Sequence, residues 1–350
     1  MKTILVTGGL GFIGSHTCVN LLESGFRVLI VDSNKIASNS IIQRIKQIGK
    51  LNNLDFTKKV LFFEGDIRDE TFLTNVFDKA RKNGTNIDAV IHFAGLKSVK
   101  ESVRNPLKYW DVNVNGSINL FRVMNQQNCK TVVFSSSATV YGYYNKDLTE
   151  DLDLNPSNPY GFTKVAIEKV LKNIFDSDKD NWRIANLRYF NPIGAHPTGL
   201  IGENPKNIPE NIFPYICQVA LGIRNKLFVF GNDWPTKDGT CVRDYIHIMD
   251  LAEAHKSALN FLQNNDPQNI DLNIGTGKGT TVLELIAEFN FANKCSINFE
   301  FANRRNGDVA QIKADIKKVS SILKWNPKNN LKNMCIDGLK WQKLNPNGFE

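Results

Sequence analysis

Short apolar runs alternate with helix-length amphipathic segments along the first half of the chain. The runs, rich in β-branched residues, predict strands at Thr3–Thr7, Arg27–Val31, Val60–Glu64, Ala89–Phe93, Thr131–Ser135 and Ile184–Tyr189. The segments between them predict helices at Ile13–Ser24, Phe72–Asn83, Pro106–Asn128 and Tyr160–Phe175. Because buried parallel strands read as continuous apolar runs and are joined by helices, this alternation predicts an α/β fold with a Rossmann-type, doubly wound parallel sheet.

The pattern changes after about residue 192, where prolines recur from Pro192 to Pro214 and break the chain into loops. Beyond them the pattern predicts a smaller α/β lobe, with a helix, a strand and a helix at Ile212–Gly222, Asp271–Ile274 and Val282–Phe291. A chain of 350 residues exceeds the size at which a single core usually stops growing. We therefore expect two domains, over residues 1–191 and 192–350, with room for strands and helices that return to the first.

Composition and charge exclude several classes of protein. The net charge is +8, but the basic residues are scattered, which argues against a nucleic-acid site. The N-terminus lacks the apolar stretch of a secretory signal, and no run reaches the length of a membrane helix. The six cysteines include no CxxC pair and are spaced like reduced thiols, so we expect no metal site and a cytoplasmic location.

A glycine-rich turn joins the first predicted strand to the first predicted helix. Residues 7–16 read TGGLGFIGSH, which places Gly8, Gly11 and Gly14 in the spacing G-x-x-G-x-x-G. Glycine lets the turn close tightly and lets backbone approach a pyrophosphate, while the helix N-terminus offers free N–H groups to its oxygens. We expect this turn, with Phe12 and Ile13, to bind a dinucleotide.

Asp32 ends the second predicted strand, 18 residues beyond Gly14. A carboxylate there can accept hydrogen bonds from both ribose hydroxyls of NAD, and it would repel the extra phosphate of NADP. No basic residue follows directly, since Ser33 and Asn34 come next. The sequence therefore predicts NAD as the cofactor, with Asn34 beside it and residues 1–191 as the NAD-binding domain.

Two further strand ends fit the same crevice. After the third strand, Asp66 could accept from the adenine amino group, with Ile67 beside it; Asp66 could equally cap the helix that begins near Asp69. After the fourth strand, small residues would let backbone pass close to a cofactor, at Phe93, Ala94 and Gly95.

Tyr160 and Lys164 lie four residues apart at the start of a predicted helix. They share one helical face, so both can point into one site. A phenol has a reference pKa of about 10, and a nearby lysine cation lowers that pKa towards the range of a base. Lys164 can also hold the nicotinamide ribose. The pair predicts a catalytic site in which Tyr160 is the base.

A polar run, FSSSATVYG, leaves the fifth predicted strand upstream of Tyr160 and contains Ser135 and Ser137. The Ser137 hydroxyl could donate to a substrate oxygen and pass its proton towards Tyr160. Serines here could also do no more than satisfy backbone groups at the strand end. We expect a catalytic set of Ser137, Tyr160 and Lys164, with Ser135 beside the cofactor.

Longer motifs carry a family resemblance. In chain order they are TGGLGFIGSH, HFAGLKSVKES, NVNG, FSSSATVYG, PYGFTK, LRYFNPIGAHPTG, FGNDWPTKDGTCVRDYIHIMDLAEAH and RRNGD. The sequence resembles the UDP-glucose 4-epimerase (UDP-galactose 4-epimerase) family of extended short-chain dehydrogenase/reductases almost end to end, most weakly over residues 35–58 and the last twenty or so. The resemblance implies an NAD-dependent isomerase of galactose and nucleotide-sugar metabolism.

The resemblance also implies a mechanism. The Tyr160 phenolate removes the proton of the sugar's 4-hydroxyl while the C4 hydride passes to NAD. The transient 4-keto sugar turns over in the pocket, still tethered by its UDP, and the hydride returns to the opposite face. No net oxidation occurs, so the cofactor need not leave.

Further site residues follow from the resemblance alone. It assigns cofactor contacts to Lys97, Asn113 and Tyr189. It assigns substrate contacts, besides Ser137 and Tyr160, to Lys97, Phe190, Asn191, Asn211, Ile212, Phe228, Phe230, Arg243, Tyr245, Arg305, Asp308 and Ile312. Among these, Arg243 and Arg305 would grip the diphosphate, whose oxygens match the planar guanidinium fork. Phe230 would stack near uracil and Asp308 would hold the uridine ribose, which makes residues 192–350 the main UDP-sugar-binding domain.

Ile312 departs from the family pattern. Galactose-selective bacterial members usually carry a tyrosine four residues after the position of Asp308, beside the C2 substituent of the sugar. Members that also accept N-acetylhexosamines carry a smaller residue there. Ile312 lacks the phenol and is shorter, so the alternative is a bifunctional or preferential UDP-N-acetylglucosamine 4-epimerase.

Three other readings of the same fold stay open. A sugar-nucleotide 4,6-dehydratase needs an acid–base pair just after the strand-five hydroxyl, where this chain has Ala138 and Thr139. A non-catalytic NAD-sensing regulator can lose the tyrosine or the lysine, and both remain here. A plain secondary-alcohol dehydrogenase would exchange its cofactor with solvent. The resemblance further implies a homodimer through helices near Pro106–Asn128 and Tyr160–Phe175.

Overall fold

The computed structural model describes residues 1–34, 40–205, 208–305 and 307–349. The chain forms two compact units, and each is built from separate stretches of sequence. Unit 1 contains Met1–Gly142, Asp153–Arg188 and Ala252–Leu272. Unit 2 contains Tyr143–Leu152, Tyr189–Leu251 and Asn273–Glu350. The passage from Arg188 to Tyr189 lies close to the boundary expected after residue 191, and residues 252–272 rejoin unit 1.

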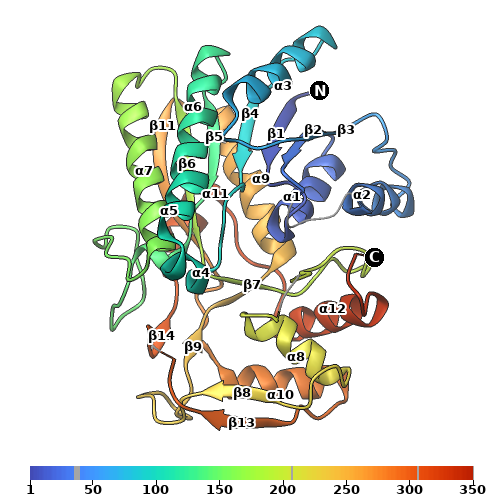
Figure 1. Cartoon of the computed structure of the whole chain (residues 1–350), viewed down its shortest axis with the longest axis vertical. Coiled ribbons are helices and arrows are strands. Elements are labelled where there is room, and N and C mark those ends of the chain that lie inside the picture. Colours follow the sequence, from blue (N-terminus) through green and yellow to red (C-terminus); the bar gives the residue numbers. More distant parts are fainter. Residues whose placement is uncertain (35–39, 206–207, 306, 350) are drawn as a thin grey trace. The chain divides into compact units, whose positions relative to one another are not determined.

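Unit 1 is built on a parallel sheet with helices on both faces (Figure 1). Within the described residues the sheet has seven strands in the order β11-β6-β5-β4-β1-β2-β3. Their bounds are β1 Thr3–Thr7, β2 Arg27–Asp32, β3 Val60–Glu64, β4 Ala89–His92, β5 Thr131–Ser135, β6 Arg183–Tyr189 and β11 Gln268–Ile274. The order reverses between β1 and β4, the switch point at which doubly wound sheets bind ligands. The predicted Rossmann-type fold is confirmed.

The longer helices of unit 1 cover the two faces of this sheet, and the short ones pack beside them. They are α1 Phe12–Glu23, α2 Ser40–Leu51, α3 Glu70–Lys82, α4 Val99–Arg104, α5 Pro106–Tyr109, η1 Trp110–Asn115, α6 Gly116–Gln126, η2 Ala138–Val140, α7 Pro159–Ser177 and α9 Ile248–Asn264. One core joins α3, α6 and α7 to the strands, through buried residues such as Val76, Phe121 and Leu171. On the other face, α1 contacts α9 where Asn20 donates to Glu253 over 2.9 Å.

Unit 2 has its own apolar core, which packs between small sheets and helices. Its strands are β7 Asn191–Ile193, β8 Leu227–Phe230, β9 Val242–Arg243, β10 Tyr245–His247, β12 Thr280–Thr281, β13 Phe299–Ala302 and β14 Gln311–Ile312. Its helices are α8 Ile212–Ala220, α10 Val282–Asn293, α11 Lys317–Leu323 and α12 Leu331–Leu344. The apolar faces of α8, α10 and α12 meet in this core, where Phe213 and Phe289 pack edge to face with ring centroids 6.1 Å apart.

The structure differs from the predicted elements in two informative places. The expected helix over Pro106–Asn128 is present as α5 and α6, but between them the π-helical turn η1 inserts without breaking the helical path. The strand expected at Asp271–Ile274 begins earlier, at Gln268, and joins the sheet of unit 1 beside β6. The amphipathic helix α9 that leads into it has no counterpart among the predicted elements.

Candidate active site

The glycine turn after β1 is held by contacts that only glycine permits. Gly8 has a φ of +70°, and a Cβ placed on it would lie 2.6 Å from the backbone nitrogen of Ala94. A Cβ on Gly14 would overlap the carbonyl oxygen of Gly8. The helix α1 begins at Phe12. Its N-cap residue, Gly11, makes no side-chain capping bond, so the first backbone N–H groups of the helix can donate to a ligand. This geometry fits a pyrophosphate.

Asp32 closes the turn from the neighbouring strand. Its carboxylate accepts from the backbone N–H of Leu10 over 3.1 Å and from that of Asn34 over 3.0 Å. Burial raises the pKa of Asp32, and these two hydrogen bonds oppose the rise. Asn34 adopts a left-handed conformation with a φ of +55°, directly after the strand. The carboxylate thus sits at the rim of the glycine turn, where a ribose would lie.

The other predicted strand-end residues of the cofactor crevice have definite partners. Asp66 forms an ion pair of 2.7 Å with Arg68, whereas Asp69 caps α3 by accepting from the backbone of Phe72. The alternative in which Asp66 caps this helix is therefore wrong. Ile67 is buried beside Asp66. After β4, the backbone of Phe93 and Ala94 lies directly against Gly8.

Asn113 is positioned by the π-helical turn η1. Its side-chain oxygen accepts from the backbone N–H of Leu96 over 2.7 Å, and its amide nitrogen donates to the Leu96 carbonyl and to Thr163 Oγ1, each over 3.1 Å. π-Helical turns occur often at functional sites, since they redirect one side chain without ending the helix. Asn113 therefore ties the loop after β4, which carries Gly95 and the exposed Lys97, to α7.

Tyr160 and Lys164 lie on the first turns of α7. Asn158 caps this helix by accepting from the backbone of Gly161 over 3.0 Å, and Pro159 occupies its first position, so the local sequence fixes where the helix begins. Tyr160 and Lys164 are both buried, at 6% and 5% exposure. The Lys164 ammonium lies 5.8 Å from the centroid of the Tyr160 ring.

The charge of Lys164 is tuned by its surroundings. Its Nζ donates to the carbonyl oxygen of Ser135 over 2.8 Å. Burial lowers the pKa of Lys164 to about 8, and the nearby Glu168 carboxylate opposes this shift. At neutral pH the side chain is therefore mainly a cation beside the phenol, which favours the phenolate. Behind it, burial lowers the pKa of His92 to about 3, so this ring is neutral.

Ser137 directly follows the Ser135–Ser136 pair at the end of β5. Its hydroxyl oxygen accepts from the backbone N–H of Thr139 over 3.3 Å and from the Thr139 hydroxyl over 3.0 Å, which caps the short helix η2. The strand-end role considered from the sequence is thus present. The Ser137 hydroxyl can both accept and donate, so it can keep the backbone bond from Thr139 while donating to a ligand oxygen.

Unit 2 gathers two of the predicted arginines with aromatic and acidic partners. Arg243 donates to the carbonyl oxygen of Val309 over 2.9 Å, and its Nη2 lies 3.7 Å from the Asp308 carboxylate. The guanidinium of Arg305 stacks on Phe230, 3.9 Å from the ring centroid. These contacts gather two guanidinium groups, a carboxylate and an aromatic ring in the part of unit 2 formed by β8, β9 and the segment before β14.

Ile312 lies in that same part of unit 2. It pairs with Arg243 in the parallel ladder of β14 and β9, and its carbonyl accepts from the backbone N–H of Asp244 over 3.1 Å. The Asp244 carbonyl in turn accepts from the backbone N–H of Asn191 over 3.0 Å. Backbone bonds therefore connect three segments that are distant in sequence, around residues 191, 243 and 312.

The remaining predicted substrate residues of unit 2 differ in exposure. Tyr245 and Phe190 are buried, at 4% and 5% exposure, whereas Phe228 is 37% exposed. Asn211 precedes α8, which begins at Ile212, and donates to Glu203 over 3.1 Å. Tyr189, which was predicted as a cofactor contact, is half-buried at the end of β6.

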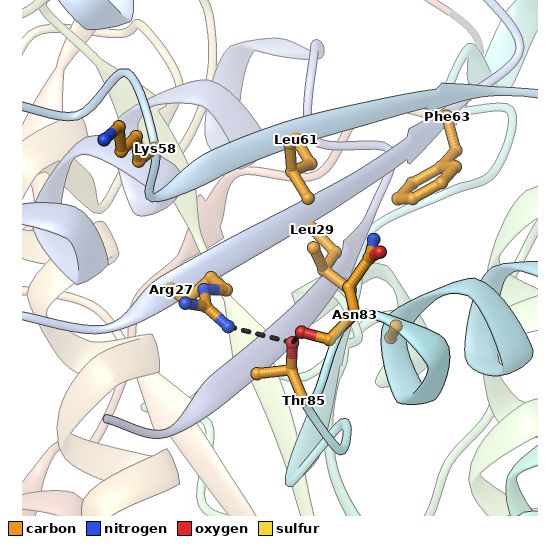
Figure 2. Close-up of a pocket in the computed structure, with 8 residues that line it drawn as sticks. Arg27, Leu29, Lys58, Leu61, Phe63, Asn83 and Thr85 are labelled. Atoms are coloured by element: carbon orange, nitrogen blue, oxygen red, sulfur yellow. Dashed lines mark hydrogen bonds between the residues drawn. The ribbon is translucent and has the colours of Figure 1, made fainter.

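A cavity of about 180 Å³ lies at the opposite end of β2 from Asp32 (Figure 2). Arg27 begins β2 there and donates to Thr85 over 2.9 Å, while Leu61 and Phe63 of β3 line the space. None of the predicted site residues lines this cavity. It is therefore separate from the carboxyl ends of the strands, where doubly wound sheets bind cofactors.

Two other features are absent from the part of the chain that the structure describes. No group of three or more His, Cys, Asp or Glu side chains is arranged to hold a metal ion among residues 1–34, 40–205, 208–305 and 307–349. Over the same ranges, no helix is long and apolar enough to cross a membrane.

A doubly wound parallel sheet, a glycine turn at its switch point and a buried tyrosine–lysine pair on one helix define an extended short-chain dehydrogenase/reductase. Comparison with known proteins agrees with this class. The chain matches the family described as GDP-mannose 4,6 dehydratase over residues 5–337. It is 46% identical over 348 residues to a UDP-glucose 4-epimerase of Bacillus subtilis, covering 99% of this chain and 98% of that protein.

Solved structures give the same result. A UDP-glucose 4-epimerase from Stenotrophomonas maltophila, with bound NAD and formylated UDP-arabinopyranose, superposes with a TM-score of 0.92 at 43% identity, covering 98% of both chains. One from Bifidobacterium longum, in complex with NAD+ and UDP, superposes with a TM-score of 0.91 at 41% identity, covering 99% of this chain and 100% of that one. The chain belongs to the UDP-glucose 4-epimerase family.

Proposed function

We propose that this chain interconverts UDP-galactose and UDP-glucose by inverting the hydroxyl at C4 of the sugar, with NAD as its cofactor. The observation that carries the proposal is the Tyr160–Lys164 pair, buried on α7 in a chain that matches epimerases over nearly its whole length. The enzyme is an isomerase, because the substrate gains and loses no electrons overall.

Unit 1 binds NAD. The open backbone groups of the glycine turn receive the pyrophosphate, and Asp32 accepts from the ribose hydroxyls. Lys97 and Asn113 of unit 1, and Tyr189 of unit 2, add contacts of the kind that the family resemblance implies. When bound, NAD supplies hydride acceptance and return at the sugar C4.

The chain's own residues move the proton. Tyr160 takes the proton of the 4-hydroxyl as a phenolate, and the Lys164 cation beside it stabilises this charged form. Ser137 donates a hydrogen bond to the same sugar oxygen. The two carriers of a dehydratase elimination are missing, because Ala138 and Thr139 stand where that reaction needs an acid and a base.

Unit 2 holds the UDP. Arg243 and Arg305 pair with the diphosphate, since their planar forks match its oxygens. Phe230 lies against uracil and Asp308 accepts from the uridine ribose. Phe190, Asn191, Asn211, Ile212, Phe228 and Tyr245 complete this part of the site.

The protein forms a homodimer through helices of unit 1. Five large apolar side chains of α4, α5, η1 and α7 are at least 41% exposed: Val99, Val103, Leu107, Trp110 and Phe162. Since α4, α5 and η1 each contact α7, these exposed apolar side chains lie on neighbouring elements, a pattern typical of protein interfaces.

The six cysteines form no disulfide, which suits the reducing cytoplasm.

Ile312 supports a second candidate function, the additional epimerisation of UDP-N-acetylhexosamines. The side chain has no phenol and is half-buried in β14, beside Arg243. A tyrosine at this position would project further from the strand, so isoleucine leaves more room for an N-acetyl group at C2.

Turnover by the purified protein tests both candidates. With no NAD added, UDP-galactose and UDP-N-acetylgalactosamine are supplied separately and the products are resolved by chromatography, with Tyr160→Phe as control. UDP-glucose from the first substrate supports the epimerase, and UDP-N-acetylglucosamine from the second adds the bifunctional reading. A 4-keto-6-deoxy product would instead identify a dehydratase. Bound NAD with no turnover of either substrate, even after NAD is added, would favour a regulator.

A further inference from the structure

Two residues on one face of α7 hold the end of β5 and the residue that follows it. Tyr160, Lys164 and Glu168 follow one another at intervals of four, so they share a face of the helix. Lys164 donates to the carbonyl oxygen of Ser135 over 2.8 Å, and Glu168 accepts from the hydroxyl of Ser136 over 2.5 Å. The next residue along the strand end is Ser137. The helix therefore holds the segment immediately before Ser137 by one cation and one anion.

Glu168 belongs to a chain of alternating charges in unit 1. Its carboxylate accepts from Arg188 Nη2 over 2.7 Å and from Arg188 Nε over 3.1 Å, and both side chains are almost fully buried, at 6% and 3% exposure. Arg188 also contacts Asp271 of β11 over 3.0 Å and donates to the Tyr141 hydroxyl over 3.0 Å. The order of charges running outward from Lys164 is plus, minus, plus, minus.

Burying a carboxylate four residues from a buried lysine has an electrostatic consequence. Burial alone disfavours the ammonium of Lys164, and the Glu168 charge opposes it. Arg188 in turn keeps the pKa of Glu168 from rising as far as burial would take it. Among the described residues, Tyr160 and, from β4, the neutral His92 also face Lys164.

We propose that Glu168 is a positioning residue for the reaction: through Ser136 it fixes the strand end that carries Ser137, and its charge, held by Arg188, keeps Lys164 cationic beside Tyr160. This role rests on the proposed function of Tyr160 and Lys164. A purely structural ion pair between α7 and β6 would require neither the bond to Ser136 nor the position one turn beyond Lys164.

Four variants separate these roles. E168Q keeps the shape of the side chain and removes its charge, whereas E168D keeps the charge and shortens the reach. S136A removes only the bond to the strand end. D271N is the matched control, because it removes a carboxylate from the same arginine at a half-exposed position away from Lys164. The protonation of Lys164 is followed by NMR on protein with isotope-labelled lysine Cε, assigned with Lys164→Arg, and kcat for UDP-galactose is measured against pH.

Each variant has its own expected effect on the Lys164 titration and on kcat. In E168Q, the Lys164 titration and the alkaline limb of kcat move to lower pH by about one unit, whereas in E168D and D271N the titration stays where it is in the unchanged protein. In S136A, kcat falls about tenfold with the titration unmoved. An unmoved titration in E168Q, or full kcat in S136A, overturns the proposal; if E168Q does not fold, S136A decides alone. A protein that never turns over UDP-galactose, although Lys164 titrates as expected, would instead sink the proposed function.

Discussion

The catalytic residues proposed in unit 1 and the diphosphate-binding residues proposed in unit 2 are held in different ways. Lys164 is buried and donates to a backbone carbonyl, and Asn113 is fixed by three hydrogen bonds. In unit 2, Arg243 keeps its Nη2 3.7 Å from Asp308, and Arg305 rests on the Phe230 ring. The first set is held by burial and hydrogen bonds, whereas the second combines the Nη1 hydrogen bonds of Arg243 to the carbonyls of Val242 and Val309 with the stacking of Arg305 on an aromatic ring.

This difference follows from what each set has to do. Proton transfer depends on the position and charge state of a phenol, and both are set by burial and by neighbouring charges. A diphosphate arrives with its own charge and displaces water from the guanidinium groups, so those groups must be reachable from solvent. Changes in unit 1 should therefore act on kcat, and changes in unit 2 on KM.

The largest effect is expected from Tyr160→Phe, which removes the proposed base and leaves the ring. General acid–base catalysis is worth about 100- to 10,000-fold, so kcat should fall by roughly 1,000-fold while the unfolding temperature changes little. Steady-state kinetics and a thermal melt measure the two quantities. A variant that keeps more than a tenth of the activity would mean that another group takes the proton.

Gly8→Ala should weaken cofactor retention next most strongly. The added Cβ would lie 2.6 Å from the Ala94 nitrogen, an overlap that typically costs about 1–3 kcal/mol. Gly25→Ala is the matched control, because Gly25 also has a positive φ but has nothing within 4 Å of its Cβ position. NAD released on denaturation should be much reduced in the first variant and unchanged in the second. Equal retention in both would show that the close approach to Ala94 is not needed.

Arg305→Ala should raise KM for UDP-galactose about tenfold and leave kcat nearly unchanged. The charge-assisted contact that it removes binds the substrate and the transition state equally. Arg304→Ala is its control, because Arg304 stacks on Trp234 and is engaged by Asp233 over 2.8 Å. A fall in kcat without a change in KM would mean that Arg305 acts in catalysis rather than in diphosphate binding.

The pH dependence of kcat should show the loss of the Lys164 cation. Its pKa is lowered to about 8, so the ammonium is present below that pH and is lost above it. For a single group of this pKa, the active fraction falls about tenfold between pH 7 and pH 9. A kcat that stays level to pH 10 would show that bound ligands hold the charge on Lys164 far more strongly than its protein surroundings do.

The smallest effect is expected from Ile312→Tyr. The larger side chain should reduce turnover of UDP-N-acetylgalactosamine about fivefold, which corresponds to about 1 kcal/mol, the lower end of the cost of overfilling a pocket, and should spare UDP-galactose. The ratio of kcat/KM for the two substrates measures this selectivity. An unchanged ratio would mean that residue 312 does not face the C2 substituent.

Much of unit 1 could be predicted from the sequence because its signals are local. The apolar runs Thr3–Thr7, Val60–Glu64 and Thr131–Ser135 match β1, β3 and β5 residue for residue. The glycine spacing and the position of Asp32 likewise depend on neighbouring residues. Local signals of this kind indicate an element but not its long-range partners.

The features that the sequence did not reveal depend on tertiary contacts. The bond from Ser136 to Glu168 and the pair of Glu168 with Arg188 join residues 32 and 20 positions apart in the chain. The π-helical turn η1 has no sequence signature of its own, and an uninterrupted helix was the natural prediction. In unit 2, β9 and β14 are too short to give a strand pattern, and only their pairing places Ile312 beside Arg243.

The most direct test of the central claim follows the hydrogen on C4 of the sugar. UDP-galactose that carries deuterium at C4 is converted by the purified protein in ordinary water, and the UDP-glucose formed is analysed by mass spectrometry and NMR. We expect the product to keep its deuterium at C4, since the hydride leaves and returns within one site. Loss of the label to solvent, or its transfer to another position of the sugar, would contradict this mechanism.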